Sequence, residues 1–305
     1  MSGRLRWSWL GVAPVLVLGL LTACERGPHA GKFDGEGALK YAGAQVSFGT
    51  RIPGTPGAQR AGDWIIARMR ERADTVIIQS WTQTLSDGRK LPLRNILARF
   101  RPELPDRVLY LTHWDTRPVS DGATDPAERK LPMPGANDGA SGVGLFVALG
   151  DALKKTPPAL GVDLLFVDGE DYGSFDDMED VLMGSTYFAA HLPSPGYRPI
   201  FGVLWDMIGD KDLAIKQEQF SLQHAPEVVR RVWQQAADLG HDDVFVNQQI
   251  APVTDDHVPL LNAGLRVIDV IDLDYPYHHR PSDTMDKISA RSLSIVGDVA
   301  EALLR

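Results

Sequence analysis

The chain has 305 residues, of which 44% are hydrophobic and 23% are charged, as expected for a globular protein with a sizeable core. Its 40 acidic residues outnumber its 31 lysines and arginines, which gives a net charge of −9 at pH 7. Phosphate groups and anionic lipid headgroups repel such a surface, and no basic patch with interleaved aromatic residues is visible, so the composition argues against nucleic-acid binding. The sequence has one cysteine, Cys24, which excludes a disulfide within the chain.

The first 23 residues have the pattern of an export signal. Two arginines precede an apolar run at 9–21, which is too short to indicate a membrane-spanning helix with confidence. The run leads into Leu-Thr-Ala-Cys (21–24), which resembles a bacterial lipobox and implies cleavage before Cys24 and lipidation of that residue. A chance cysteine at the end of a signal peptide is the alternative. The chain that remains would carry 29 basic and 40 acidic residues, a net charge of −11.

The lipobox resemblance also implies a place in the cell. We expect a lipid anchor at Cys24 in the bacterial cell envelope and a polar, glycine-rich tether at 24–37, followed by a domain at 38–305. Glu25 follows Cys24 where lipoproteins of the inner membrane commonly have Asp, which favours the periplasmic face of the outer membrane.

The rest of the sequence alternates between strand and helix patterns. Apolar or alternating runs predict strands at 75–84, 93–100, 108–112, 162–167, 200–205, 213–220 and 265–273, with Asp87-Gly88 as a hairpin turn between the first two. Helical periodicity predicts helices at 36–48, 58–73, 140–153, 181–191, 226–239 and 289–304, and a short helix opening at 254–257. This order predicts an α/β fold: a three-layer αβα sandwich around a central mixed, mostly parallel sheet.

Several predicted strands end in acidic or imidazole side chains. These are His113 and Asp115, then Glu170 and Asp171, then Asp206, and after the last strand His278 and His279, while Asp138 joins them from a glycine-rich turn before a helix. The carboxyl ends of parallel strands meet at one crevice, where closely packed carboxylates repel one another unless a cation neutralises them. Because histidines contribute, zinc is favoured over magnesium or calcium.

Glu170 and Asp171 are adjacent at one strand end, where two side chains cannot easily reach one metal ion. We therefore expect one to bind the metal and the other to remain free as a proton shuttle. For Asp115, we favour hydrogen bonding to the second ring nitrogen of His113 over direct metal binding.

Six motifs in order identify a family resemblance that runs from about residue 48 to the C-terminus. They are His-x-Asp at 113, Gly-Ala-Asn-Asp-Gly-Ala-Ser-Gly at 135, Asp-Gly-Glu-Asp at 168, Trp-Asp-Met-Ile-Gly at 205, Asp-Asp-His at 255 and His-x-Pro-x-Asp-Thr at 279. Together they resemble the zinc-dependent aminopeptidase and glutaminyl cyclase superfamily. The sequences around His113, Asp168 and Asp255 look closest to the glutaminyl-peptide cyclotransferase branch.

The resemblance implies roles for individual residues. It implies zinc ligands at Asp138, Asp171 and His279, with His279 preferred over His278 because the last motif starts there. Glu170 resembles the catalytic acid and base of the family.

Three more roles follow from the same resemblance. His113 and Asp206 match positions that bind a second zinc in the aminopeptidases and no metal in the animal cyclases. Asp256 resembles the cyclase carboxylate that forms hydrogen bonds beside Glu170 and Asp206.

The chain departs from the cyclase pattern in its pocket. His278 stands where cyclases usually have Trp, and we expect it to be a pocket or solvent residue. Tyr172 and Phe175 follow the acid pair where another Trp is usual, and Asp171 replaces the Glu of animal cyclases. These changes bear on substrate specificity more than on metal binding.

The leading hypothesis is a zinc-dependent cyclase that converts the N-terminal Gln of peptides or proteins to pyroglutamate and releases ammonia. An aminopeptidase of the same fold is the alternative, with Glu170 activating the attacking water and with two zinc ions. A catalytically silent surface-binding lipoprotein is a third hypothesis, against which the intact Glu170 argues. The sequence does not indicate an oligomeric state.

Overall fold

A computed structural model describes Met1, Gly3 and residues 33–305, and the chain from Phe33 onward forms one compact unit. Cys24 lies outside the described residues, as does the predicted export signal apart from Met1 and Gly3. The predicted tether is described only from Phe33 onward. The end of that tether segment belongs to the domain, because helix α1 (Gly35–Val46) begins there and the side chain of Asp34 caps it. Among the described residues, none of the helices combines the length and apolar character that a membrane crossing requires.

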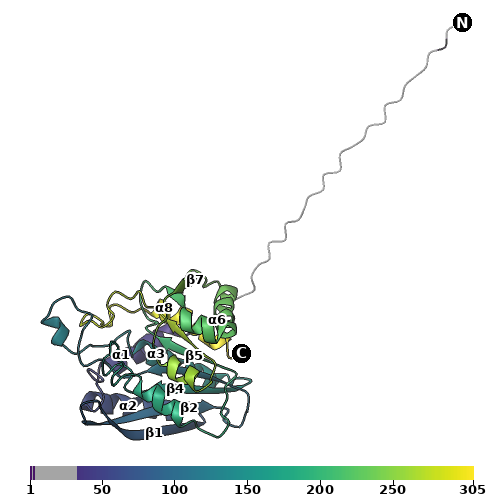
Figure 1. The fold of residues 1–305 in the computed structure, drawn as a ribbon. Coiled ribbons are helices and arrows are strands. Elements are labelled where there is room, and N and C mark those ends of the chain that lie inside the picture. The colour runs from purple at the N-terminus through teal and green to yellow at the C-terminus, as the bar shows by residue number, and fades with distance from the viewer. Residues whose placement is uncertain (2, 4–32) are drawn as a thin grey trace. The chain divides into compact units, whose positions relative to one another are not determined.

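Six strands form the central sheet in the order β1-β2-β4-β3-β5-β8 (Figure 1). Their bounds are Thr75–Thr84 (β1), Lys90–Phe100 (β2), Arg107–His113 (β3), Gly161–Val167 (β4), Phe201–Asp206 (β5) and Val267–Ile271 (β8). Strand β2 pairs antiparallel with β1 and with β4, whereas β4, β3, β5 and β8 run parallel. The predicted mixed, mostly parallel sheet is confirmed, and β1 and β2 form the predicted hairpin at its edge.

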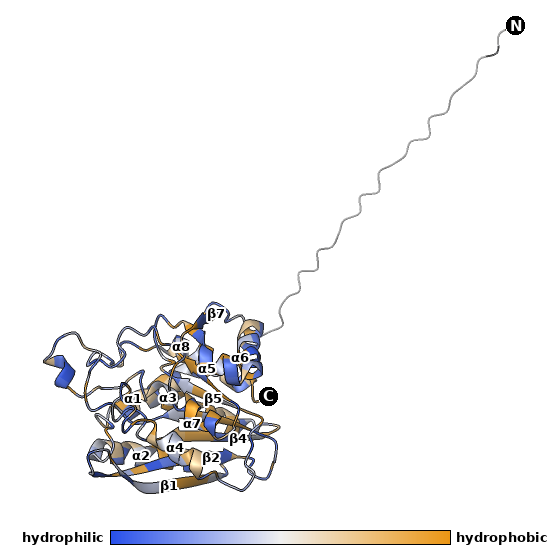
Figure 2. Ribbon diagram, viewed as in Figure 1, coloured by the Kyte–Doolittle hydropathy of each residue, from blue (hydrophilic) through white to orange (hydrophobic). Residues whose placement is uncertain are grey.

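Helices cover both faces of the sheet, which confirms the three-layer prediction. One layer holds α1 with α2 (Pro56–Arg70), α3 (Ser141–Lys155), α6 (Pro226–Leu239) and α8 (Ala290–Ala302); the other holds α4 (Met183–Ala190) and α7 (His257–Asn262). Alternate residues of a strand enter opposite layers, so Tyr110 packs in the larger apolar cluster and Leu111 in the smaller one. The inner strands β3, β4, β5 and β8 are accordingly buried along their whole length, and most of their residues are apolar (Figure 2).

Part of the predicted outer strand at 213–220 is wrong. Strand β6 (Ile215–Glu218) is followed at once by helix α5 (Gln219–His224), because the carboxylate of Glu218 accepts hydrogen bonds from the amides of Phe220 and Ser221 and so caps the helix. Strand β7 (Phe245–Ile250) was not predicted; it pairs parallel with β6, and its half-polar sequence has no clear alternation.

A buried ion pair ties three strands together near the end of the sheet where β4 begins. Asp163 of β4 accepts hydrogen bonds from Arg107 of β3 at 2.6 and 2.7 Å, from Arg99 of β2 at 3.0 Å and from the hydroxyl of Tyr197 at 2.7 Å. The Asp163 carboxylate is fully buried and all its contacts are charge-assisted or polar, so losing it would leave a buried guanidinium without its partner.

We predict that Asp163→Ala lowers the free energy of unfolding by about 3–5 kcal/mol, since Arg107 then remains buried and unpaired. Denaturant unfolding of the purified protein measures this change. Glu103→Ala is the control, because its pair with Arg101 is exposed and should leave the unfolding midpoint close to that of the unmodified protein. Equal, small shifts for both variants would contradict this account of β4.

Candidate metal centre

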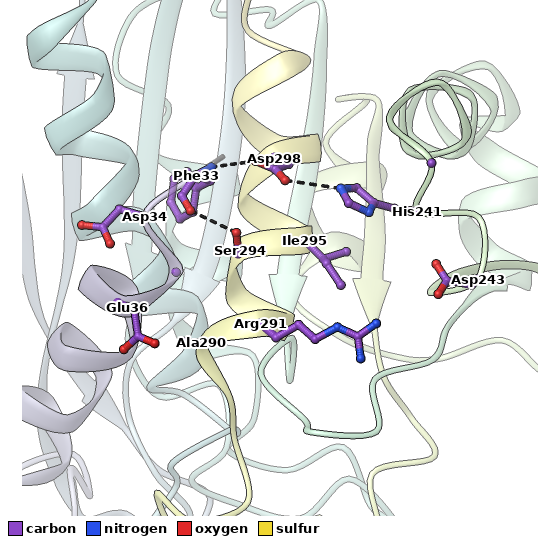
Figure 3. Close-up of a pocket in the computed structure, with 12 residues that line it drawn as sticks. Phe33, Asp34, Glu36, His241, Asp243, Ala290, Arg291, Ser294, Ile295 and Asp298 are labelled. Carbon is purple, nitrogen blue, oxygen red and sulfur yellow. Dashed lines mark hydrogen bonds and ion pairs between the residues drawn. The ribbon is translucent and has the colours of Figure 1, made fainter. Parts of the chain in front are cut away.

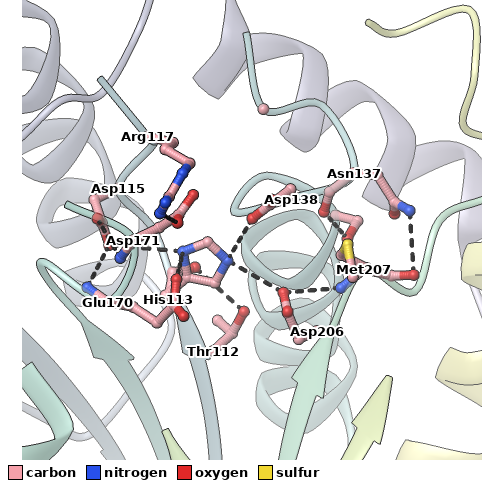
Figure 4. A network of polar contacts seen from close by, with 12 residues as sticks. Thr112, His113, Asp115, Arg117, Asn137, Asp138, Glu170, Asp171, Asp206 and Met207 are labelled. Atoms are coloured by element: carbon pink, nitrogen blue, oxygen red, sulfur yellow. Dashed lines mark hydrogen bonds and ion pairs between the residues drawn. The ribbon is translucent and has the colours of Figure 1, made fainter. Parts of the chain in front are cut away.

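The carboxyl ends of the neighbouring parallel strands bring the predicted site residues together (Figure 4). His113 ends β3 and Asp206 ends β5, the next strand in the sheet. The Nε2 atom of His113 lies 3.1 Å from an oxygen of Asp206 and 3.0 Å from an oxygen of Asp138. All three side chains are buried, so their charges interact with little screening from water.

Asp138 is held by a turn and by a distant loop. The turn ends at Gly139, whose φ of 92° and close approach to the carbonyl of Asp115 leave no room for a side chain. The amides of Asn137 and Asp138 both donate hydrogen bonds to the carboxylate of Asp283, at 2.9 and 3.1 Å. Asp283 therefore fixes this turn although it lies 145 residues further along the chain.

His279 lies next to both of the other predicted zinc ligands. Its Nε2 atom lies 3.4 Å from Asp171 Oδ1 and 3.8 Å from Asp138 Oδ2. The second oxygen of Asp171 and Oδ2 of Asp138 are buried without a hydrogen-bond partner. A buried, unsatisfied polar atom costs about 1–3 kcal/mol, and more when it is charged, so a cation bound by these oxygens would remove a large penalty. These residues fit a zinc ion.

Two sets of ligand atoms lie within 4.8 Å of one another: those of His113, Asp138 and Asp206, and those of Asp138, His278 and His279. Both sets share Asp138, and neither contains Asp171, which approaches the second set through its contact with His279. His278, which we predicted to be a pocket or solvent residue, thus offers a ring nitrogen close to Asp138, and its ring centroid lies 3.9 Å from that of His279.

Glu170 and Asp171 take different directions, as the sequence predicted. Glu170 Oε2 lies 3.5 Å from Nδ1 of His113, whereas Asp171 turns toward His279. Burial raises the pKa of Glu170 well above its usual value, although the nearby His113 opposes the shift. Glu170 is therefore a carboxylate with unusual proton affinity beside the predicted metal ligands.

Asp115 lies beside the second ring nitrogen of His113, as predicted, but its hydrogen bonds go elsewhere. Its two oxygens accept hydrogen bonds from the amides of Glu170 and Asp171, both at 3.2 Å, while Nδ1 of His113 is 3.6 Å away and has no hydrogen-bond partner. Asp115 thus fixes the turn that carries the acid pair. No sequence spacing indicates this contact, because it joins the ends of two neighbouring strands.

Asp256 is buried near the acid pair but does not form the hydrogen bonds that the family resemblance implied. Within residues 33–305, both its oxygens lack a hydrogen-bond partner. Burial raises its pKa to about 7, and its charge contributes to the raised pKa of Glu170. Two further buried carboxylates belong to this cluster, and burial raises the pKa of both. Asp255 begins the Asp-Asp-His motif but was given no role from the sequence, whereas Asp269 was missed. Asp269 is the one acidic residue of the otherwise apolar strand β8. A charged residue within a buried strand was the signal that could have identified it.

A buried arginine also escaped sequence reasoning. The guanidinium of Arg51 donates to the carbonyls of Pro134 and Gly135 in the turn before Asp138, and its amide donates to Thr116. Burial lowers its pKa to about 10, while the charges of Asp283 and Asp138 oppose the shift. Arg51 remains a cation at neutral pH and offsets part of the negative charge around the site.

A cavity of about 340 Å³ opens beside these residues. Its polar wall includes Asp138, Glu170 and His279, and its apolar wall consists of Phe175, Met178, Met207, Val253, Ile271 and Leu273. A larger hollow of about 690 Å³ lies between the starts of α1 and α8 (Figure 3), where Asp298 contacts His241 and the amide of Phe33. That hollow holds none of the predicted site residues, so the smaller cavity is the candidate site.

Comparisons with known proteins agree with this geometry. The sequence model of Peptidase family M28 matches residues 95–304. The crystal structure of glutaminyl cyclase from Porphyromonas gingivalis is 37% identical with a TM-score of 0.87, covering 90% of this chain and 99% of that one. The structure of a leucine aminopeptidase precursor from Bacteroides thetaiotaomicron is 32% identical with a TM-score of 0.87, covering 90% and 97%.

Curated relatives are similar over a shorter stretch. A protein named "Probable zinc metalloprotease" from Leptosphaeria maculans is 35% identical over 163 residues, which are 48% of this chain and 35% of that protein. The chain spans about a third of the length of this protein and of two similar curated relatives.

We predict that zinc binds more tightly as pH rises. Burial opposes protonation of His279, but Asp171 and Asp121 raise its pKa to about 10, so the metal-free ring carries a proton at neutral pH that zinc must displace. Each released proton should tighten binding about tenfold per pH unit below that pKa. Calorimetry in buffers of different ionisation enthalpy counts the protons released, and binding without proton release would contradict the prediction.

Proposed function

Because the chain belongs to peptidase family M28, we propose that it is a zinc enzyme acting on the N-terminal residue of peptides or proteins, and that it cyclises N-terminal Gln to pyroglutamate. The observation that favours cyclisation is the position of His113. Its Nε2 atom already contacts Asp138 and Asp206 at hydrogen-bond distance, and the surrounding carboxylates raise its pKa well above the usual value against the effect of burial. A hydrogen on Nε2 that donates to these carboxylates would keep this nitrogen from binding a second ion.

Asp138, Asp171 and His279 would hold one zinc ion, which when bound would polarise the γ-carbonyl of the substrate glutamine. Glu170 would accept a proton from the α-amine as its nitrogen attacks the γ-carbon. The same carboxyl group would then return the proton to the amide nitrogen, which leaves as ammonia when its bond to carbon breaks. Burial raises the pKa of Glu170, which strengthens it as a proton acceptor.

The cavity supports an N-terminal substrate. Its carboxylates can accept hydrogen bonds from the neutral α-amine that attacks, and side chains such as Phe175, Met207 and Ile271 offer apolar surface to the methylene groups of glutamine. Asp206 and Asp256 would assist by exchanging protons with Glu170, since both are buried and close enough for their charges to affect His113.

An aminopeptidase is the second candidate, and one observation favours it. The ligand atoms of His113, Asp138 and Asp206 lie within 4.8 Å of one another and would hold a second zinc ion if His113 were neutral. In that case Glu170 would take the proton from the attacking water, and the peptide bond after the first residue would break.

We also propose that the protein is exported and anchored to the bacterial cell envelope by a lipid on Cys24. The apolar run at 9–21 and the lipobox-like residues that end at Cys24 support this proposal. Substrates would then be peptides or protein N-termini outside the cytoplasm.

Mass spectrometry of peptides with N-terminal Gln, Leu or Ala tests the reaction. After incubation with the zinc-loaded protein, we expect the Gln peptide alone to lose the mass of ammonia, with its sequence intact. Release of free N-terminal Leu or Ala would contradict cyclisation and favour the aminopeptidase. Metal analysis of the same sample should give one zinc per chain, whereas two would favour the peptidase.

We predict that Glu170→Gln lowers kcat by about 10²–10⁴-fold, because the amide cannot carry the proton while the shape of the site is kept. The zinc content of the variant should stay close to that of the unmodified protein, since Glu170 is not among the proposed ligands. Steady-state kinetics and metal analysis on one preparation measure both. Full activity of this variant would contradict both enzymatic proposals.

A further inference from the structure

The loop that follows β3 contacts two proposed zinc ligands through a pair of charged residues. Arg117 and Asp121 lie in this loop, outside the sheet, and neither was singled out from the sequence. We propose that they form a positioning pair that holds Asp171 and His279 in the orientation that zinc requires. This inference rests on the proposed zinc function.

The contacts close a ring of four side chains. Arg117 donates two hydrogen bonds to Asp121, at 2.8 and 2.6 Å, and one to Asp171 Oδ1, at 2.6 Å. Asp121 Oδ1 lies 3.2 Å from Nδ1 of His279, and Nε2 of His279 lies 3.4 Å from Asp171 Oδ1. Arg117 therefore contacts the ligand Asp171, and Asp121 contacts the ligand His279. Arg117 and Asp121 also contact each other.

The contact with Asp121 determines which nitrogen of His279 can bind a metal. When Nδ1 carries the hydrogen that Asp121 accepts, the lone pair of neutral His279 is on Nε2, which faces Asp138 and Asp171. Without this acceptor, nothing else in the ring selects that tautomer. Carboxylate acceptors of this kind orient metal-binding histidines and increase their basicity.

The planar guanidinium of Arg117 fixes the positions of the Asp121 and Asp171 carboxylates. Its side chain is only 4% exposed, whereas that of Asp121 is 43% exposed, so burial does not fix Asp121. The paired hydrogen bonds from Arg117 do so, while its third nitrogen binds Asp171. Lysine carries the same charge but lacks this fork, and it could not hold both carboxylates at these angles.

The backbone adds a further link between the loop and the histidine. The amide of Gly122 donates to the carbonyl of His279 at 3.0 Å, and a Cβ at Gly122 would lie 2.6 Å from the carbonyl of His278. The loop therefore packs directly on the segment where His279 has a φ of 53°, a conformation uncommon for residues other than glycine.

Zinc affinity of the full-length protein, measured by competition with a chelator, tests the inference. We expect Asp121→Ala and Arg117→Lys each to weaken zinc binding about 10–100-fold, and Asp121→Asn, which keeps an oxygen acceptor, to weaken it less. Asp63→Asn is the matched control, because Asp63 pairs with Arg94 at the same 2.6 Å but touches no proposed ligand. This control should leave zinc affinity unchanged.

The double variant Arg117→Lys, Asp121→Ala adds a test of the ring. If the two residues act as one unit, its loss of affinity should be well below the product of the single losses. Thermal melting of the zinc-free variants separates positioning from folding, since a positioning role leaves the metal-free melting temperature close to that of the unmodified protein.

Unchanged zinc affinity in Asp121→Ala, with the unmodified protein binding zinc tightly, would overturn the inference and leave the proposed function standing. An affinity loss that only follows a lowered metal-free melting temperature would also overturn it. Failure of the unmodified protein to bind zinc would instead overturn the proposed function on which the inference rests.

Discussion

Negative charge is concentrated at the carboxyl ends of the parallel strands, and the surrounding residues compensate for it. Asp138, Glu170, Asp171 and Asp206 are each at most 7% exposed, and Asp255, Asp256 and Asp269 are buried close to them. In a poorly polarisable interior, such carboxylates repel one another strongly unless cations or hydrogen-bond donors face them. Histidine rings and the buried Arg51 supply part of that compensation. The unpartnered oxygens of Asp138 and Asp171 indicate that a metal ion supplies the rest.

The network that supports the acid cluster joins segments far apart in the sequence. The N-terminal loop contributes Arg51, the loop after β3 contributes Arg117 and Asp121, and the C-terminal loop contributes Asp283. Each of these residues acts on a proposed ligand or on the turn that carries it, and none lies on the sheet. The sheet sets where the strands end, while these loops set the directions of the ligand side chains. Changes in the loops should therefore affect metal affinity before they affect the fold.

Much of the site was predictable because parallel strands place their carboxyl ends together. The apolar runs that end near His113, Glu170 and Asp206 predicted that these side chains lie close together, and the structure brings them into contact. The supporting contacts were not predictable, since Asp115 binds the next strand's turn and Asp121 binds a histidine more than 150 residues later. The helix α5 was missed for a local reason: the capping carboxylate of Glu218 follows an alternating run that is typical of a strand. Strand β7 was missed because its polar residues lack the alternation on which the prediction depended.

The central claim is that Asp138, Asp171 and His279 bind one zinc ion together, with Glu170 left free beside it. Crystals grown with zinc and measured at the zinc absorption edge test it directly. The account predicts an anomalous peak about 2.0–2.2 Å from a nitrogen of His279 and from an oxygen of each aspartate, with Glu170 outside the coordination sphere. A peak coordinated by Glu170, or a zinc-loaded crystal without a peak between these three residues, would contradict it.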